Sequence, residues 1–388
     1  MRIVQISNFP PSVLGGMEAV VYNLSKELGA KGHEVDVITS THDSKIQRVY
    51  RDNFRIFYVP SIEVNSRMVL PKNLSVIRRV IEGCEIVHLH SPDVSFALEI
   101  GVLSKIQRKP IVTSILAFLD VFSHPFLSAR IFAFPIGFST SFLAKISECV
   151  HVKNALDYAR LSKISNEVVY IPDGITDCHF KAERDPNLFS EKFGIEGKKV
   201  ILYVGRLHRL KGPQVLIQSL KFIVEEEPEA VLAIVGPGED YRKYLEILAE
   251  KLDLEDHVTF AGVVTESEKI SAYDAAQLVA IPSCGDSVEA FSLVASEAWA
   301  RGKPVVASNV GALRCRVKPG INGYLAEPNS PNDLAKKILR AFDMRVKEVP
   351  SDVCDWKHVA KMFEQLYRRV MSSLITRNNG KFDADEST

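Results

Sequence analysis

The sequence has no excess charge of either sign, and its few cysteines follow no recognisable spacing. Its 388 residues include 48 Lys and Arg against 48 Asp and Glu, which argues against the basic balance of a nucleic-acid-binding protein. The six cysteines form no C-x-x-C pair and no metal-ligand pattern. Such spacing is typical of free thiols in a reducing compartment. We therefore expect a cytoplasmic protein without a nucleic-acid partner.

Long apolar runs are also missing. No stretch reaches about 18 uninterrupted apolar residues, so no transmembrane helix is expected. The first residues predict a short strand that ends at Pro10-Pro11 rather than a signal peptide. Residues 110–143 are nevertheless rich in phenylalanine. A core helix with its flanking loop is the simpler interpretation, and an apolar acceptor groove or membrane-facing patch is the alternative.

Strand and helix patterns alternate along the whole chain. Apolar runs that predict strands lie at 3–6, 35–38, 86–89, 111–113, 168–171, 200–204, 231–235, 258–260, 278–281 and 305–307. Separated by amphipathic helices, they predict parallel sheets covered on both faces. The length exceeds what one core supports, and the pattern restarts near residue 198. We expect an α/β protein with two doubly wound, Rossmann-like domains, 1–175 and 176–355, facing a cleft.

Two glutamates that follow the apolar run at 278–281 are the most informative feature. Glu289 and Glu297 stand eight positions apart, and a polar loop precedes them. On one helix they would be rotated by roughly 80° and would not share a face. The geometry works better if Glu289 lies in the loop and Glu297 in the first turns of a helix. The N–H groups of Phe291, Ser292 and Leu293 would then be free at the helix start, which suits a phosphate.

A second motif follows the strand at 200–204. Gly205 and Gly212 bracket a turn that contains Arg206 and Lys211. Ligands bind at the carboxyl edge of such sheets, and a diphosphate needs cations there. A solvated basic turn is the simpler interpretation of this motif alone.

Two features of the first half carry weaker signals. Gly15 and Gly16 stand between the first strand and the first helix, but they do not form G-x-G-x-x-G, so a nicotinamide site is disfavoured. His88 and His90 point to one face of a strand. No third metal ligand accompanies them, so hydrogen-bonded histidines at a strand end are the preferred interpretation, and no metal site is predicted.

The segment around Glu289 and Glu297 resembles the E-x7-E signature of retaining glycosyltransferases of the GT-B class, of the family 4 (group 1) type. Residues 205–212 resemble the family's G-R-x-x-x-x-K-G motif, and residues 9–18 its F-x-P-x-x-G-G-x-E motif. The resemblance covers nearly the whole chain. It implies a GT-B fold whose terminal helix, about 356–375, returns to the first domain, before a disordered tail at 376–388.

The resemblance also implies the roles of the site residues. Arg206 and Lys211 would hold the donor diphosphate and, with Glu289, make up the catalytic set. Glu289 would orient the sugar hydroxyls. The donor-binding set is completed by Gly16, Phe291, Ser292, Leu293 and Glu297. His90 would be an acceptor-side contact. No cofactor and no metal are implied.

The sequence departs from the family at three places. Relatives carry a histidine after the strand at 111–113, whereas residues 113–118 contain none and His124 is displaced. The usual E-G-F-G is Glu-Ala-Phe-Ser at 289–292, and the usual G-G-x-P-E is Gly-Ala-Leu-Arg-Cys at 311–315. These changes affect the acceptor side and the catalytic details.

Taken together, these features predict a retaining, metal-independent glycosyltransferase of the hexosyltransferase type. It would move a sugar from a nucleotide-diphosphate donor to a hydroxyl acceptor. A sugar-nucleotide epimerase of the same architecture and a catalytically weak sugar-nucleotide-binding protein are the alternatives. Residues 45–79 include eight basic residues but only two acidic ones. With the aromatic stretch, this makes a lipid or lipid-linked acceptor and peripheral contact with the inner face of an anionic membrane a further hypothesis.

Overall fold

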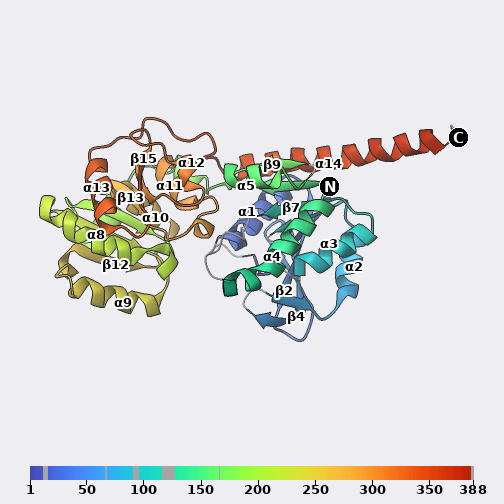
Figure 1. Ribbon diagram of the computed structural model, residues 1–388, viewed down its shortest axis with the longest axis horizontal. Coiled ribbons are helices and arrows are strands. Elements are labelled where there is room, and N and C mark those ends of the chain that lie inside the picture. The colour runs from blue at the N-terminus through green and yellow to red at the C-terminus, as the bar shows by residue number, and fades with distance from the viewer. Residues whose placement is uncertain (12–15, 66–67, 91–95, 116–126, 166, 386–388) are drawn as a thin grey trace. The chain divides into compact units, whose positions relative to one another are not determined.

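The protein consists of two compact α/β units. The computed structural model describes residues 1–11, 16–65, 68–90, 96–115, 127–165 and 167–385. Unit 1 comprises residues 1–174 and 356–388, and unit 2 comprises residues 175–355 (Figure 1). The chain thus enters unit 2 once and returns with its last helix to unit 1.

Unit 1 is built on one sheet. Its strands are β1 (Arg2–Ile6), β2 (Glu34–Thr41), β3 (Gln47–Arg51), β4 (Phe54–Asn65), β5 (Met68–Pro71), β6 (Ile86–His90), β7 (Ile111–Ile115), β8 (Cys149–Val152) and β9 (Val168–Tyr170). They follow the order β3-β4-β2-β1-β6-β7-β8-β9, with β5 paired to β4. The strands from β4 to β9 in this order are parallel, whereas β3 and β5 run antiparallel to β4.

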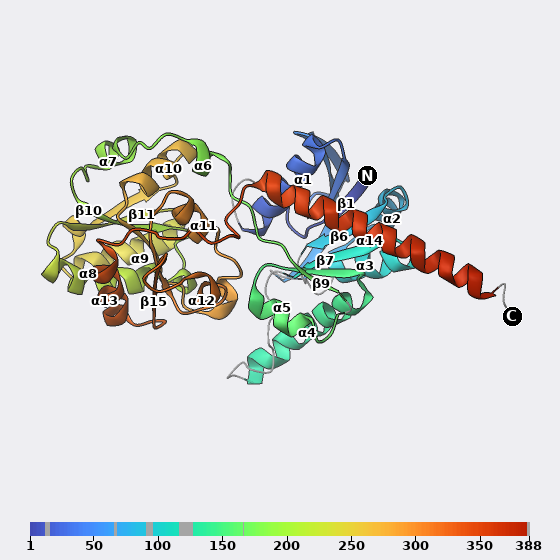
Figure 2. The same ribbon diagram turned by 90° about the horizontal axis from the view of Figure 1, so that it is seen from above.

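Helices cover the sheet of unit 1. They are α1 (Met17–Ala30), α2 (Leu74–Glu82), α3 (Phe96–Ile106), α4 (Leu127–Ile146), α5 (Ala155–Leu161) and α14 (Trp356–Asp385). Apolar residues of β1 and β6 share a core with residues of α2, α3 and α4. Helix α14 packs against α1 (Figure 2). The hydroxyl of its Tyr367 lies 2.6 Å from His88 Nδ1 of β6.

Helix α14 differs from its expected length. The sequence predicts a helix over about 356–375 and disorder beyond it, whereas the helix continues to Asp385. Extending an existing helix by one residue costs little compared with nucleating a new one, so a polar tail can continue the helix that the core has fixed.

Unit 2 contains a parallel sheet between two layers of helices. Its strands are β10 (Lys199–Val204), β11 (Ala230–Val235), β12 (Val258–Gly262), β13 (Leu278–Ile281), β14 (Val305–Ser308) and β15 (Gly323–Ala326). Its helices are α6 (Cys178–Lys181), α7 (Asn187–Phe193), η2 (Arg209–Lys211), α8 (Pro213–Glu226), α9 (Glu239–Glu250), η3 (Glu255–His257), α10 (Glu266–Ala275), η4 (Asp286–Val288), α11 (Leu293–Ala300), α12 (Leu313–Arg316) and α13 (Pro331–Ala341). Helices α8, α9 and α13 share one core with the sheet, and α7, α10 and α11 share the other.

The strand order of unit 2 locates a binding position. The order is β12-β11-β10-β13-β14-β15, so the direction of winding reverses between β10 and β13. In sheets of this kind, ligands bind outside the carboxyl ends of the strands at the point of reversal. The loops that follow β10 and β13 therefore frame the expected site.

The sequence predicts no transmembrane helix. Across the described parts of the chain, the helices fall short of the length and apolar character that spanning a bilayer requires.

Candidate functional site

The loops after β10 and β13 meet at the switch point of unit 2. Gly212, which ends η2, has a φ of +75°, and a Cβ built on it would lie 1.9 Å from the carbonyl oxygen of Pro282. Only glycine permits both this backbone conformation and this approach. The contact brings the turn with the two cations next to the loop with Glu289.

Lys211 and Glu289 form the polar centre of the site. Lys211 Nζ lies 2.7 Å from Glu289 Oε1, and the same carboxylate oxygen accepts a 2.7 Å hydrogen bond from Ser283 Oγ. Glu289 is 3% exposed, so its charge needs these partners. Arg206 lies two positions after the end of β10, is exposed, and forms no ion pair with any residue that the structure describes. Its guanidinium is therefore available to an anionic ligand.

The backbone of Glu289 is fixed by the loop after β14. A Cβ on Gly311, whose φ is +49°, would lie 2.3 Å from the carbonyl oxygen of Glu289. The same oxygen accepts a 2.8 Å hydrogen bond from the N–H of Ala312. Three consecutive loops of the sheet thus hold Glu289 in place, as a preorganised site requires.

The three predicted N–H groups stand at the start of α11. Helix α11 begins at Leu293, and Ser292 precedes it in a left-handed conformation with φ +72° and ψ 87°. Within the described chain, the N–H groups of Phe291, Ser292 and Leu293 have no hydrogen-bond partner. Unpaired N–H groups at the positive end of a helix dipole are suited to bind an anion.

Glu297 lies within α11 and belongs to a second polar group. Its carboxylate accepts hydrogen bonds from the Tyr273 hydroxyl at 2.6 Å and from Lys269 Nζ at 3.1 Å, both on α10. His179 Nε2 lies 3.6 Å from it. Burial and the charge of Glu297 raise the pKa of Tyr273, so this phenol stays protonated and donates its hydrogen bond. The two glutamates therefore have separate partners.

The neighbouring carboxylate of this second group is strongly acidic. Burial acts to raise the pKa of Glu266, but His179 at 3.3 Å and Lys269 at 3.0 Å outweigh it, and the pKa is about 2. Sequence reasoning missed Lys269, Tyr273 and His179. They lie in ordinary helical patterns, and only the packing of α10 and α6 beside α11 brings them to Glu297.

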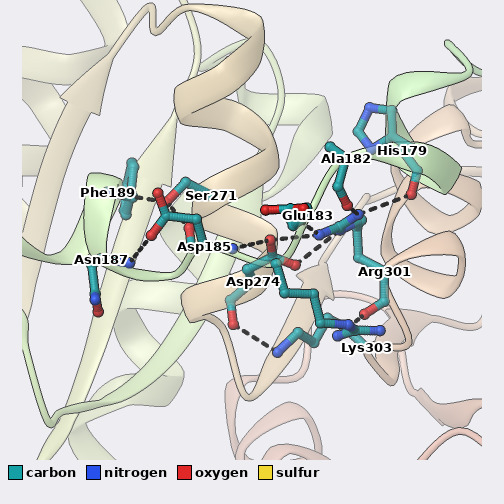
Figure 3. Close-up of polar contacts among 11 residues, drawn as sticks. His179, Ala182, Glu183, Asp185, Asn187, Phe189, Ser271, Asp274, Arg301 and Lys303 are labelled. Carbon is teal, nitrogen blue, oxygen red and sulfur yellow. Dashed lines mark hydrogen bonds and ion pairs between the residues drawn. The ribbon is translucent and has the colours of Figure 1, made fainter.

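The other end of α11 is held by an arginine. Arg301 forms a two-contact ion pair with Asp274, at 2.6 and 2.9 Å, and donates to the carbonyl oxygen of Ala182 at 2.9 Å. Figure 3 shows its guanidinium among the carbonyl groups of the 179–183 segment, with Lys303 donating to the Asp274 carbonyl. The side chains of Arg301 and Asp274 are nearly buried, at 4% and 2% exposure. This pair fixes α11 to α10, and the sequence offered no signal for it.

Two of the predicted site residues, Gly16 and His90, belong to unit 1. Gly16 is exposed at the start of α1, with a φ of −75° that any residue adopts and nothing within 4 Å of a Cβ built on it. His90 is buried, its Nε2 lies 2.7 Å from Gln5 Oε1, and its ring lies 3.9 Å from that of His88. These contacts agree with the interpretation of hydrogen-bonded histidines at a strand end.

The segment after β7, where the sequence lacks the family's histidine, is described only in part. Thr113, Ser114 and Ile115 lie in β7, but residues 116–118 and His124 are outside the described residues. Ser114 Oγ bridges His88 Nε2 and His151 Nδ1, at 2.6 and 2.7 Å, so this strand end carries a polar network.

Comparison with known proteins gives two family matches that together cover most of the chain. Residues 186–352 match the model of glycosyl transferases group 1, and residues 14–132 match that of glycosyltransferase family 4. The first match contains the site of unit 2, and the second lies within unit 1.

Relatives and solved structures agree with these matches. A D-inositol 3-phosphate glycosyltransferase of Corynebacterium urealyticum is 37% identical over 184 residues, which are 44% of this chain and 43% of that protein. An uncharacterized glycosyltransferase of Methanocaldococcus jannaschii is 27% identical over 96% of this chain and all of its own length. The chain thus spans less than half of the first relative and the whole of the second.

The fold is shared with solved structures at lower identity. Sucrose-phosphate synthase from Thermosynechococcus elongatus has a TM-score of 0.73 at 23% identity, covering 96% of this chain and 99% of that one. Anabaena HepE, solved in complex with UDP-glucose, has a TM-score of 0.69 at 17% identity, covering 97% and 100%. With the two family matches, these findings show that the chain has the GT-B fold and belongs to the group 1 glycosyltransferases of the family 4 type.

Proposed function

We propose that the protein transfers a glycosyl residue from a nucleoside-diphosphate sugar to a hydroxyl acceptor with retention of anomeric configuration. The bond between the anomeric carbon and the diphosphate oxygen breaks, and the nucleoside diphosphate leaves with the electron pair. The acceptor oxygen forms the new bond to the anomeric carbon, and its proton passes to the departing diphosphate oxygen.

The observation that carries the proposal is the meeting of Lys211 and Glu289 at the switch point of unit 2. A cation, a buried carboxylate and unpaired N–H groups converge where the sheet topology favours a ligand. An anion beside a hydroxyl-bearing sugar matches this set of groups. HepE, which shares the fold, is solved with UDP and glucose, so a UDP-sugar is the first donor to test.

The proposed roles follow from charge and hydrogen-bonding capacity. Arg206 and Lys211 neutralise the charge that grows on the leaving diphosphate, a role that a metal ion fills in other enzymes. Glu289, held by Ser283 and Lys211, accepts hydrogen bonds from the sugar hydroxyls. Glu297 accepts from the ribose hydroxyls, in exchange for one of its present partners on α10. The reaction then needs no added metal.

The test is a panel of UDP-, GDP- and ADP-sugars with EDTA present, with slow hydrolysis and donor binding measured for the wild type and Glu289→Gln. Glu227→Gln is the control, because Glu227 also forms an ion pair with a lysine, Lys199, at 2.6 Å, and this pair lies outside the site. We expect one donor to be hydrolysed by the wild type and the control but not by Glu289→Gln. NMR of the released sugar reads its anomeric configuration. Absence of binding for every donor would contradict the donor site.

A lipid or lipid-linked acceptor is a further part of the proposal. Strand β3 is exposed along its length and contains Arg48 and Arg51, and Phe138 of α4 is 61% exposed. Basic side chains are attracted to anionic membrane surfaces, and exposed aromatic side chains favour the membrane interface. Flotation with anionic and with neutral vesicles tests this. Binding to anionic vesicles that weakens with salt is expected, and equal recovery with both kinds would contradict it.

A further inference from the structure

One buried arginine lies behind the loop that would receive the donor diphosphate. Arg316, the last residue of α12, is 6% exposed and uses its whole guanidinium. It donates to the carbonyl oxygens of Phe291 at 2.7 Å and Ser292 at 3.1 Å, and to Ser296 Oγ at 2.8 Å. Asp352 receives its two remaining contacts, at 3.0 and 2.9 Å.

The guanidinium is also packed between aromatic rings. Its central carbon lies 3.9 Å from the ring centroid of Phe291 and 5.1 Å from that of Trp299. A buried cation is costly unless its charge and all its donors are satisfied, and Asp352 neutralises this one. The planar fork of arginine fits such a set of acceptors, whereas lysine offers only a point charge.

The two carbonyl contacts determine where the loop's N–H groups point. In a trans peptide, the C=O and N–H of one unit point in opposite directions. The oxygens of Phe291 and Ser292 belong to the same peptide units as the nitrogens of Ser292 and Leu293. Because Arg316 holds both oxygens, it directs both N–H groups away from itself.

The held conformation is one that serine rarely adopts. Ser292 has a φ of +72°, where the family motif has glycine. A non-glycine residue in this region is strained, and it persists only where surrounding contacts impose it. The side chain of Ser292 caps no N–H group, so this turn is held instead through the carbonyl oxygen of Ser292, which accepts a hydrogen bond from Arg316.

We propose that Arg316 is a positioning residue: it holds the 291–292 turn so that the N–H groups of Ser292 and Leu293 face the donor diphosphate, and it offsets the strain at Ser292. The inference rests on the proposed donor site, since it assigns the direction of that site's backbone groups. Asp352 assists by neutralising the guanidinium, from a segment that lies just before the end of unit 2.

A double-mutant cycle tests this proposal. Donor Kd, KM and kcat are measured for Arg316→Met and Arg316→Lys, each alone and combined with Ser292→Gly. We expect Arg316→Met to raise the donor Kd by about tenfold or more, because loss of the contacts lets the turn relax. In the Ser292→Gly background the same change should cost at least about threefold less, because glycine adopts the turn without strain. An equal loss in both backgrounds would overturn the proposal.

Arg301→Met is the matched control. Arg301 is as buried as Arg316, its ion pair with Asp274 is as short, and it lies at the opposite end of α11 without touching the 291–292 turn. It should lower thermal stability without raising the donor Kd tenfold. If Arg301→Met raises Kd as much as Arg316→Met, the effect is general destabilisation and the proposal fails.

The outcomes also separate this inference from the proposed function. If the wild type binds no donor of the panel, the donor site itself is wrong. If the wild type binds a donor and Arg316→Met binds it equally well, only the positioning role is wrong. Arg316→Lys retains a charge for Asp352, so it is the variant to use if the methionine variant does not fold, and an unchanged Kd there would equally contradict the proposal.

Discussion

At the scale of single residues, Ser292 shows how a family motif and a local backbone conformation disagree. Its φ of +72° is costly for serine by about 1–2 kcal/mol, whereas glycine adopts it freely. We expect Ser292→Gly to raise the free energy of unfolding by about 1 kcal/mol, after the larger backbone entropy of glycine is counted. Urea unfolding measures it. Ser219→Gly, inside α8, should instead destabilise by a similar amount.

The histidine network of unit 1 predicts a dependence of stability on pH. Burial lowers the pKa of His151 to about 3, although its hydrogen bond to the Ile171 carbonyl opposes this, and burial also lowers the pKa of His88. The unfolded chain takes up a proton near pH 6.5, while the folded chain does not. The stabilisation that depends on the neutral form of these histidines is therefore fully present above pH 6.5. It is lost as pH falls toward 3, by about 1.4 kcal/mol per pH unit for His151.

The measurement is the free energy of unfolding between pH 7.5 and 4.5. His151→Gln keeps a hydrogen-bonding side chain and should flatten the slope, whereas His208→Asn, an exposed histidine in unit 2, should leave it unchanged. Equal slopes for the wild type and His151→Gln would contradict the assignment.

Motif spacing was enough to predict some site residues but not others. It placed Lys211 and Glu289 on loops that follow neighbouring strands, and the structure brings them to 2.7 Å. It did not predict that Glu297 would be held by Lys269 and Tyr273, because that contact depends on how α10 packs beside α11. Arg316 was missed for the same reason, since no local pattern marks a buried cation.

At the scale of elements, the closeness of η2 to the loop after β13 depends on one glycine. Gly212→Ala would place a Cβ 1.9 Å from the Pro282 carbonyl oxygen, so the two loops must separate. We expect loss of donor binding and a stability loss above the 1–2 kcal/mol of backbone strain alone. Calorimetry with the best donor and urea unfolding measure the two effects.

Gly194→Ala separates the cost of backbone strain from the cost of the close contact with Pro282. Gly194 also has a left-handed conformation, with φ +64°, but nothing lies within 4 Å of a Cβ built on it. It should show the strain cost only and retain donor binding. Equal behaviour of both variants would mean that loop contact does not form the site.

Strands with continuous apolar runs were predictable, whereas β3 and β4 were not. The parallel strands β10 and β11 are buried along most of their length, so their sequences are apolar throughout. Strand β3 is exposed at all its residues, and β4 contains Pro60, so neither has the pattern of a buried strand. Strand β4 pairs with β2, and β3 pairs with β4, so these two segments become strands through tertiary pairing.

At the scale of the whole molecule, the two units have separate cores, and the donor groups belong to unit 2. Ligand binding to the native state alone stabilises it by about 2.7 kcal/mol at a hundredfold excess over Kd. We expect hydrogen exchange to slow on donor addition at 205–212 and 282–293. Protection confined to unit 1 would contradict this placement.

The most direct test of the central claim is calorimetric binding of UDP-, GDP- and ADP-sugars, in EDTA, to the wild type and Lys211→Met. Lys199→Met is the control, since Lys199 forms an ion pair of similar length with Glu227 away from the switch point. We expect the wild type and the control to bind one donor, and Lys211→Met to lose affinity for it by tenfold or more, about 1.4 kcal/mol. Equal affinity of all three proteins, or no binding to any donor, would contradict a donor site at Lys211 and Glu289.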